Sequence, residues 1–165
     1  EWAAALDFLR SRVGLLDAVV FSGGEPTLQE GLAGAIEDVK RLGFSIGLHT
    51  AGPYPEKLAA VLPLIDWVGL DVKAPFERYD EVNGAAGSGE KVRESLRLIV
   101  ESAVDHECRT TVHAALFSAC ELSALSESLF ELPLLLQEDV ADHPGCLRIA
   151  IRKVKMHDFG YFCAL

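Results

Sequence analysis

The chain has 165 residues, of which 50% are hydrophobic and 24% are charged. That length allows one domain with a core of its own, and the composition is ordinary for a soluble globular protein. The formal net charge of −10 disfavours nonspecific binding to nucleic acid or to an anionic membrane surface. No apolar run approaches the roughly 20 residues of a membrane span, and no signal peptide is visible. We therefore expect a cytoplasmic protein with neither a nucleic-acid partner nor a membrane partner.

Helical and strand patterns alternate along the chain. Apolar residues at helical spacing predict helices over 1–12, 28–42, 55–62, 90–102 and 121–130. Apolar runs between them predict strands over 18–22, 44–49, 67–71 and 108–113, with one more candidate over 134–137. Such alternation predicts an α/β fold with a parallel sheet and right-handed crossovers. Since the chain shows no Ser/Gly linker and no repeat, we expect one domain over 1–147, followed by an atypical tail over 148–165.

The first predicted strand ends in Gly23, Gly24, Glu25 and Pro26. Two glycines bring bare backbone to the edge of a sheet, where a ligand can approach closely. Glu25 adds a charge at that edge, and Pro26 suits the first turn of a following helix. Two interpretations remain open, a ligand site or a tight turn whose glycines only satisfy geometry. For Glu25 the structural alternative is a carboxylate that stabilises a helix N-terminus.

Polar residues also follow or end the other predicted strands: His49, Thr50, Asp71, Lys73, Arg109 and His113. In a parallel α/β barrel the carboxyl ends of the strands share one face, and sites are built there. We therefore predict that these residues and the Gly-Gly-Glu turn form one site.

Each of these residues also has a structural alternative. Asp71 and Lys73 lie two apart on a strand, so they point to one side, where they either pair with each other or bind a zwitterion such as an amino acid. Arg109 either binds a carboxylate or pairs with an acidic neighbour. His49 and His113 are either ligand contacts or satisfied histidines. We expect the remaining histidines at the surface: His106, His143 and His157.

The four cysteines are widely spaced and form no CxxC or CxxxCxxC motif: Cys108, Cys120, Cys146 and Cys163. Such spacing disfavours a self-contained zinc or cluster site. Without a secretory context we expect reduced thiols, buried for structural reasons.

Four segments, in this order along the chain, resemble the radical S-adenosylmethionine (SAM) enzymes. They read Val-Val-Phe-Ser-Gly-Gly-Glu-Pro-Thr at 19–27, Leu-His-Thr-Ala-Gly-Pro-Tyr-Pro at 48–55, Asp-Trp-Val-Gly-Leu-Asp-Val-Lys-Ala-Pro at 66–75 and Arg-Thr-Thr-Val-His at 109–113. Within that superfamily they are most similar to the activating proteins of anaerobic ribonucleoside-triphosphate reductase and of other glycyl radical enzymes. The resemblance covers roughly residues 1–130.

The resemblance implies a partial (βα)6 barrel, open on one side. It implies a 4Fe–4S cluster with three cysteine ligands, and SAM that chelates the fourth iron. Electron transfer to SAM then yields a 5′-deoxyadenosyl radical, which in an activase removes hydrogen from a glycine of a partner protein. Carried over by position, Gly23, Gly24 and Glu25 would hold the amino group of SAM. The other positions would lie near SAM (His49, Thr50), beside its carboxylate (Asp71, Lys73) or further round the site (Arg109, His113). No residue is assigned a catalytic role.

One departure from the family pattern concerns the cluster, whose CxxxCxxC motif is absent here. The family carries it in the loop after the first strand, so we expect that strand and loop upstream of Glu1. A chain without those thiolates would be inactive alone. It would also expose a sheet edge beside the strand at 18–22, which predicts poor solubility or dimerisation. For 148–165 a frameshift, an alternative end and a variant final helix all remain open.

The function that follows is a radical SAM oxidoreductase that activates a glycyl radical enzyme, here an anaerobic ribonucleotide reductase. A flavodoxin or a ferredoxin-type protein would supply its electrons. Two alternatives remain, a SAM-binding barrel without redox activity and another radical SAM enzyme that acts on a small molecule.

Overall fold

The computed structural model describes residues 2–113, scattered positions between 118 and 129, and the segments 139–140, 146–153 and 161–164. Its helices are α1 (Trp2–Arg10), α2 (Leu32–Arg41), α3 (Pro55–Val61), α4 (Tyr79–Asn83) and α5 (Ser88–Ser102). Its strands are β1 (Ala18–Phe21), β2 (Ser45–Thr50), β3 (Trp67–Asp71), β4 (Asp105–His113), β5 (Asp139–Val140), β6 (Cys146–Lys153) and β7 (Tyr161–Ala164). Short 3-10 turns are η1 (Pro26–Leu28), η2 (Leu62–Leu64) and η3 (Phe76–Arg78).

One sheet carries the described strands in the order β5-β6-β4-β3-β2-β1-β7. β1 to β4 run parallel to one another, with His49 opposite Gly69 and Asp71 opposite Arg109. Helices connect these four strands along the chain. The predicted α/β fold with a parallel sheet is therefore confirmed.

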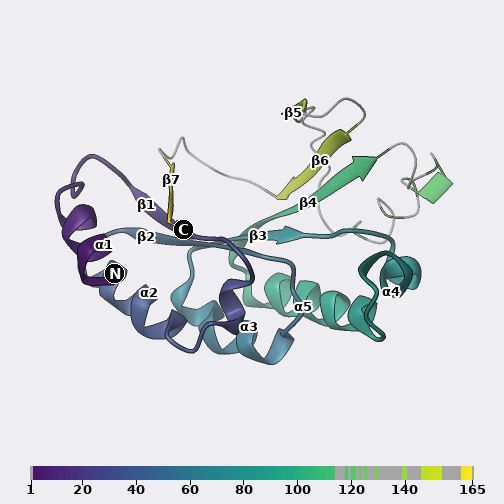
Figure 1. Cartoon of the computed structure of the whole chain (residues 1–165), viewed down its shortest axis with the longest axis horizontal. Helices are drawn as coiled ribbons and strands as arrows, with labels where there is room; N and C mark the ends of the chain where they lie inside the picture. Colours follow the sequence, from purple (N-terminus) through teal and green to yellow (C-terminus); the bar gives the residue numbers. More distant parts are fainter. Residues whose placement is uncertain are drawn as a thin grey trace.

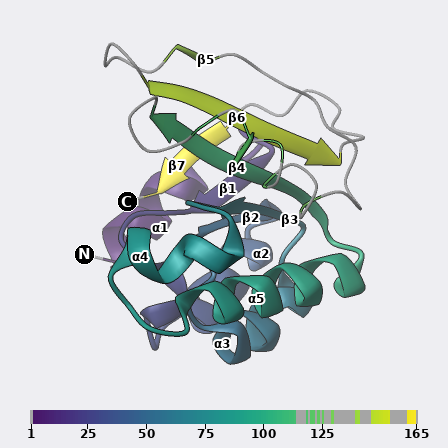
Figure 2. The same cartoon turned by 90° about the vertical axis from the view of Figure 1, so that its right-hand side faces the viewer.

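The two faces of the sheet differ in chemistry. Helices α2, α3 and α5 lie on one side of it in both views (Figure 1, Figure 2). Alternate strand residues, among them Leu48, Val68 and Leu70, pack with these helices in one core and are fully buried. Burial of each such side chain stabilises the fold by roughly 1.5–3 kcal/mol. Because side chains alternate along a strand, the residues between them, such as His49 and Asp71, face the side away from these helices.

The predicted helix over 28–42 is shorter than expected. Pro26–Leu28 forms the 3-10 turn η1, and α2 begins at Leu32. Gln29 has extended backbone angles (φ −75°, ψ 121°), which interrupt the helical path between them. A separate short turn after Glu25 is thus what positions the polar end of β1.

The C-terminal strands correct two expectations. β7 pairs in parallel with β1, with Ala18 opposite Tyr161, so the edge of β1 is covered and the prediction of an exposed edge is wrong. β6 pairs antiparallel along β4, from His106 opposite Lys153 to His113 opposite Cys146. The described parts of the tail, 148–153 and 161–164, are therefore strands and not a final helix. The division into 1–147 and 148–165 stays a prediction.

Two further corrections concern His106 and Cys120. His106 is only 3% exposed, because it lies on the same side of β4 as the buried Cys108, and its Nδ1 lies 2.8 Å from the carbonyl oxygen of Val104. Cys120 is exposed and not buried as expected. Cys108 is buried as expected, and burial raises the pKa of its thiol to about 12. The side chains of Cys146, Cys163, His143 and His157, and the candidate strand at 134–137, lie outside the described residues.

Candidate functional site

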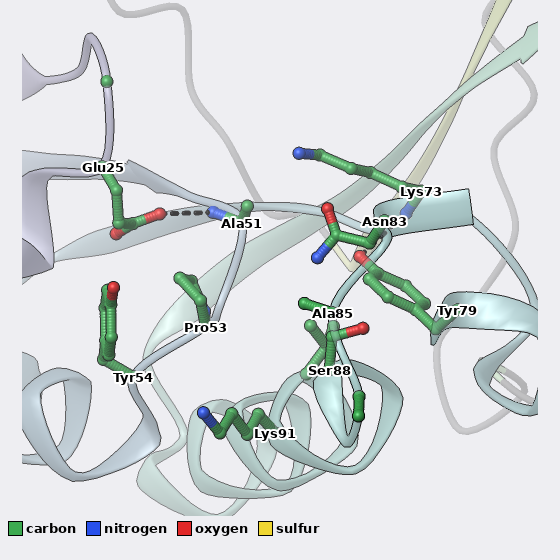
Figure 3. Close-up of a pocket in the computed structure, with 13 residues that line it drawn as sticks. Glu25, Ala51, Pro53, Tyr54, Lys73, Tyr79, Asn83, Ala85, Ser88 and Lys91 are labelled. Carbon is green, nitrogen blue, oxygen red and sulfur yellow. Dashed lines mark hydrogen bonds between the residues drawn. The ribbon is translucent and has the colours of Figure 1, made fainter. Parts of the chain in front are cut away.

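A pocket of about 360 Å³ lies at the carboxyl ends of β1, β2 and β3 (Figure 3). Glu25 reaches it from the loop after β1, Tyr54 from the loop after β2, and Lys73 from the segment after β3. Asn83 of α4 and Lys91 of α5 add further polar groups to its lining. Residues that follow these three strands therefore meet at one pocket, as the sequence predicted.

Glu25 ties the first two loops together. Its Oε1 accepts hydrogen bonds from the Thr27 N–H (3.1 Å), the Thr27 hydroxyl (2.5 Å) and the Thr50 hydroxyl (2.8 Å). Its Oε2 accepts the N–H of Ala51 at 3.0 Å. Glu25 is also the N-cap of η1, so the structural alternative from the sequence is correct. Since a carboxylate has about four lone-pair sites, Oε2 is the oxygen that retains capacity for a ligand.

The two glycines before Glu25 are required by backbone conformation. Gly23 and Gly24 have φ of 90° and 52°, a region that side chains rarely adopt. A Cβ at either position would meet nothing within 4 Å, so crowding is not the reason for glycine here. The turn therefore leaves exposed backbone in open space at the end of β1, as the sequence predicts for a site of close approach.

Lys73 extends over the pocket as a cation without a partner among the described residues. Its backbone N–H donates to the Tyr79 hydroxyl at 3.0 Å, and that hydroxyl donates to the Asp71 carbonyl at 3.4 Å. Tyr79 is 1% exposed, and burial raises its pKa to about 12, so the phenol stays protonated as this donor. Lys73 thus has an anchored backbone and a free amine (Figure 3).

Asp71 pairs with Arg109 instead of Lys73. Nε and Nη2 of Arg109 donate to Asp71 Oδ1 at 2.9 Å and 2.8 Å, across directly paired positions of β3 and β4. The expectation that Arg109 pairs with an acidic neighbour is confirmed, and the Asp71–Lys73 ion pair is wrong. Both contacts fall on one oxygen of Asp71, which leaves Oδ2 for another donor.

His49 joins the same polar group from β2. Its Nε2 lies 3.2 Å from Nη1 of Arg109, and its Nδ1 lies 3.4 Å from the Ser22 hydroxyl. A guanidinium only donates, so Nε2 accepts and Nδ1 carries the proton of a neutral ring. Burial, with the charge of Arg109, lowers the pKa of His49 to about 4. Neutral His49 and paired Asp71 therefore surround Arg109 on the side of the sheet away from the helices.

Gly69 makes room for this arrangement. A Cβ there would lie 2.8 Å from side-chain atoms of both His49 and Trp67. These two rings meet edge to face with centroids 5.4 Å apart. The absence of a side chain at position 69 thus lets His49 reach Arg109.

Two predicted residues remain, Thr50 and His113. Thr50 is 2% exposed, and its hydroxyl bonds Glu25 and accepts the N–H of Gly52, so it supports the site from beneath. His113 ends β4 opposite Cys146, and its side chain lies outside the described part. Sequence reasoning did not select Tyr54, Tyr79, Asn83 and Lys91. Tyr54 lies within the quoted segment 48–55 but was given no role there, whereas the other three lie on α4 and α5, outside the quoted segments.

Neither a metal cluster nor a membrane helix is found in the described residues. There, no group of three or more His, Cys, Asp or Glu side chains could hold a metal ion. Across the same part of the chain, no helix has the length and apolar character to cross a membrane.

Comparison with known proteins identifies the family of this chain and its relatives. The family model described as the radical SAM superfamily matches residues 1–117. A protein of Methanocaldococcus jannaschii named for glycyl-radical enzyme activation is 36% identical over 113 residues, which cover 64% of this chain and 45% of that protein. A 7-carboxy-7-deazaguanine synthase of Thermococcus kodakarensis is 41% identical over 66 residues, 39% of this chain and 26% of that protein. The chain therefore spans less than half the length of these two curated relatives.

A solved structure shares the fold. It is a domain of pyruvate-formate lyase-activating enzyme from Bacteroides vulgatus, with a TM-score of 0.59 at 17% identity. The match covers 68% of this chain and 71% of that one. The α/β architecture thus agrees with that of a known activating-enzyme domain.

Proposed function

The chain belongs to the radical SAM superfamily, and we propose that it is the SAM-binding part of an enzyme that activates a glycyl radical enzyme. The name of the Methanocaldococcus relative supports this class of activity. For the target we propose an anaerobic ribonucleoside-triphosphate reductase, and for the electron donor a flavodoxin or a ferredoxin-type protein. We also propose that the enzyme works in the cytoplasm.

The observation that carries the proposal is the free amine of Lys73 beside the Gly-Gly-Glu turn. The amino-acid part of SAM is a zwitterion, which needs a cation for its carboxylate and acceptors for its ammonium. Lys73 offers the cation, while Oε2 of Glu25 and the exposed backbone of Gly23 and Gly24 offer acceptors. The residues present therefore fit SAM.

Family membership implies a 4Fe–4S cluster as well as SAM. Together these groups supply hydrogen-atom abstraction from a carbon of the substrate. The described residues of this chain do not offer three thiolates for such a cluster. We propose that its cysteine ligands lie upstream of Glu1, and the role of this chain is to bind and orient SAM.

Calorimetric titration of the chain with SAM tests the site. We expect Lys73→Gln to weaken SAM binding by roughly tenfold to a hundredfold, because a charge-assisted contact of about 1.5–3 kcal/mol is lost. Lys40→Gln is the matched control, since Lys40 pairs with Asp66 away from the pocket. Equal affinity of both variants and the parent chain would contradict the assignment of Lys73.

The target is tested with the complete protein, its cluster and a reductant. Electron paramagnetic resonance should then detect a glycyl radical on the reductase, and its absence with an active cluster would refute this target. A second candidate is a radical SAM enzyme that acts on a small molecule, favoured by the segment 41% identical to the Thermococcus synthase. SAM cleavage that depends on a small molecule and not on the reductase would identify it.

A further inference from the structure

Three of the four described cations without an ion pair lie at the pocket or next to one of its lining residues. Most of its lysines and arginines form ion pairs with carboxylates, such as Lys40 with Asp66 and Arg97 with Glu94. Among described residues, no ion pair is present for Arg12, Lys57, Lys73 and Lys91. Lys73 and Lys91 line the pocket, and the Lys57 amine lies 5.3 Å from the ring of Tyr54, which also lines it. In a chain with a net charge of −10, this is a local excess of positive charge.

The pocket presents hydrogen-bond donors and few negatively charged groups. Glu25 is the carboxylate among its described lining residues, and that side chain already accepts four hydrogen bonds. Neither the Asn83 amide nor the Tyr54 hydroxyl bonds another described residue, and both line the cavity. Free N–H and O–H donors together with ammonium groups suit a ligand rich in anionic oxygen.

The two lining lysines stand at different ends of the pocket. Figure 3 shows Lys73 at the top of the view, reaching from the segment after β3, and Lys91 at the bottom, on α5. Tyr54 lies on the opposite wall from Asn83, with Pro53 between. The SAM carboxylate needs one cation, which Lys73 provides, and Lys91 is left for a second anion.

We propose that Tyr54, Asn83 and Lys91 line a second subsite, which binds an anionic group of the substrate near the hydrogen atom that is removed. On a partner protein that group is the carboxylate of an acidic side chain. This inference rests on the proposed function, because Lys73 is assigned to SAM there. Lys91 supplies the charge, Asn83 and Tyr54 supply directional donors, and Lys57 adds positive potential behind the ring of Tyr54. The subsite would hold the substrate by its anionic group beside SAM.

Nuclear magnetic resonance of lysines carrying 13C-methyl groups tests the subsite, with inorganic phosphate and acetate as probes. The sequence has six lysines, and a methylated lysine keeps its charge, so each signal can be assigned by a Lys→Arg variant. We expect phosphate or acetate to shift the Lys91 signal saturably, in the presence of saturating SAM, while the ion-paired Lys40 hardly responds. The probe that binds more tightly identifies the anionic group.

Variants sharpen this result. Lys91→Gln should weaken binding of the probe at least tenfold, read from the Lys57 signal, whereas Lys91→Arg should retain it. Asn83→Ala should weaken it severalfold, and unchanged circular dichroism would show that each variant is folded. Parallel shifts of Lys40 and Lys91, or displacement of the probe by SAM, would overturn the subsite. Absence of a SAM-induced shift at Lys73 would count against the proposed function, and the response of Lys91 would still decide the subsite.

Discussion

The two sides of the pocket are built in opposite ways. On the glutamate side, Glu25 lines the pocket and accepts hydrogen bonds from Ala51 and from the buried Thr27 and Thr50. On the lysine side, made of Lys73, Asn83 and Lys91, the side chains carry no hydrogen bond or ion pair to described residues. The glutamate side is held in place by the protein itself, whereas the lysine side has free donors that a ligand can satisfy. Stability and ligand affinity should therefore respond to different residues.

Removing the centre of the glutamate side should have the largest effect on stability. Glu25→Ala leaves two backbone N–H groups and two hydroxyls without their acceptor, and we expect it to cost about 2–4 kcal/mol of unfolding free energy. Urea denaturation followed by circular dichroism measures this loss. Stability equal to that of the parent chain would show that these bonds contribute little.

A substitution at Gly69 should have the second-largest effect on stability. Gly69→Ala places a methyl group 2.8 Å from His49 and Trp67 side-chain atoms. Overpacking of this kind costs about 1–3 kcal/mol, and it should also move His49 away from Arg109. The matched control is Gly34→Ala on α2, where a Cβ would meet nothing within 4 Å. This variant should stabilise the fold slightly, because alanine has a higher helix propensity than glycine. Equal unfolding free energies for the two variants would contradict the close packing.

The polar side chains around Arg109 predict that the folding stability depends on pH. The pKa of His49 falls from 6.5 to about 4 on folding, because burial and Arg109 disfavour the imidazolium. The unfolded chain thus binds a proton that the folded chain does not, and stability should decrease as the pH falls from about 6.5 to about 4. Since His49 is half-buried, screening reduces the loss to about 1–2 kcal/mol. Unfolding free energies of the parent chain and of His49→Asn between pH 7 and pH 4 check this, and the variant should lose less.

The smallest effect on stability belongs to the lysine side. Lys73→Gln removes an exposed amine without a described partner, so unfolding free energy should change by less than about 0.5 kcal/mol while SAM affinity falls. Urea midpoints for Lys73→Gln and Glu25→Ala complete the comparison. A large destabilisation by Lys73→Gln would mean that its amine has a structural role.

Local sequence patterns were sufficient to predict helices and strands of the parallel core. The strand at 67–71 and the helix at 55–62 agree with β3 and α3 to within one residue, because buried runs and Pro55 at a helix start are local signals. The sequence also predicted that the residues after β1, β2 and β3 meet at one edge, since parallel strands allow no other arrangement of their carboxyl ends. The positive φ of Gly23 and Gly24 follows from the residue type as well.

Only the tertiary structure decided which groups pair and which stay free. Asp71 is two residues from Lys73 in sequence, yet strand register places Arg109 directly beside it. His106 is buried because register places it beside Val68, on the face of the sheet that packs in the core. β7 returns from the far end of the chain to cover the edge of β1. Such contacts join residues tens of positions apart, and no local pattern encodes them. Residue types and spacing therefore determined the elements and their polar ends, while packing and register determined that Lys73 and Lys91 remain available to ligands.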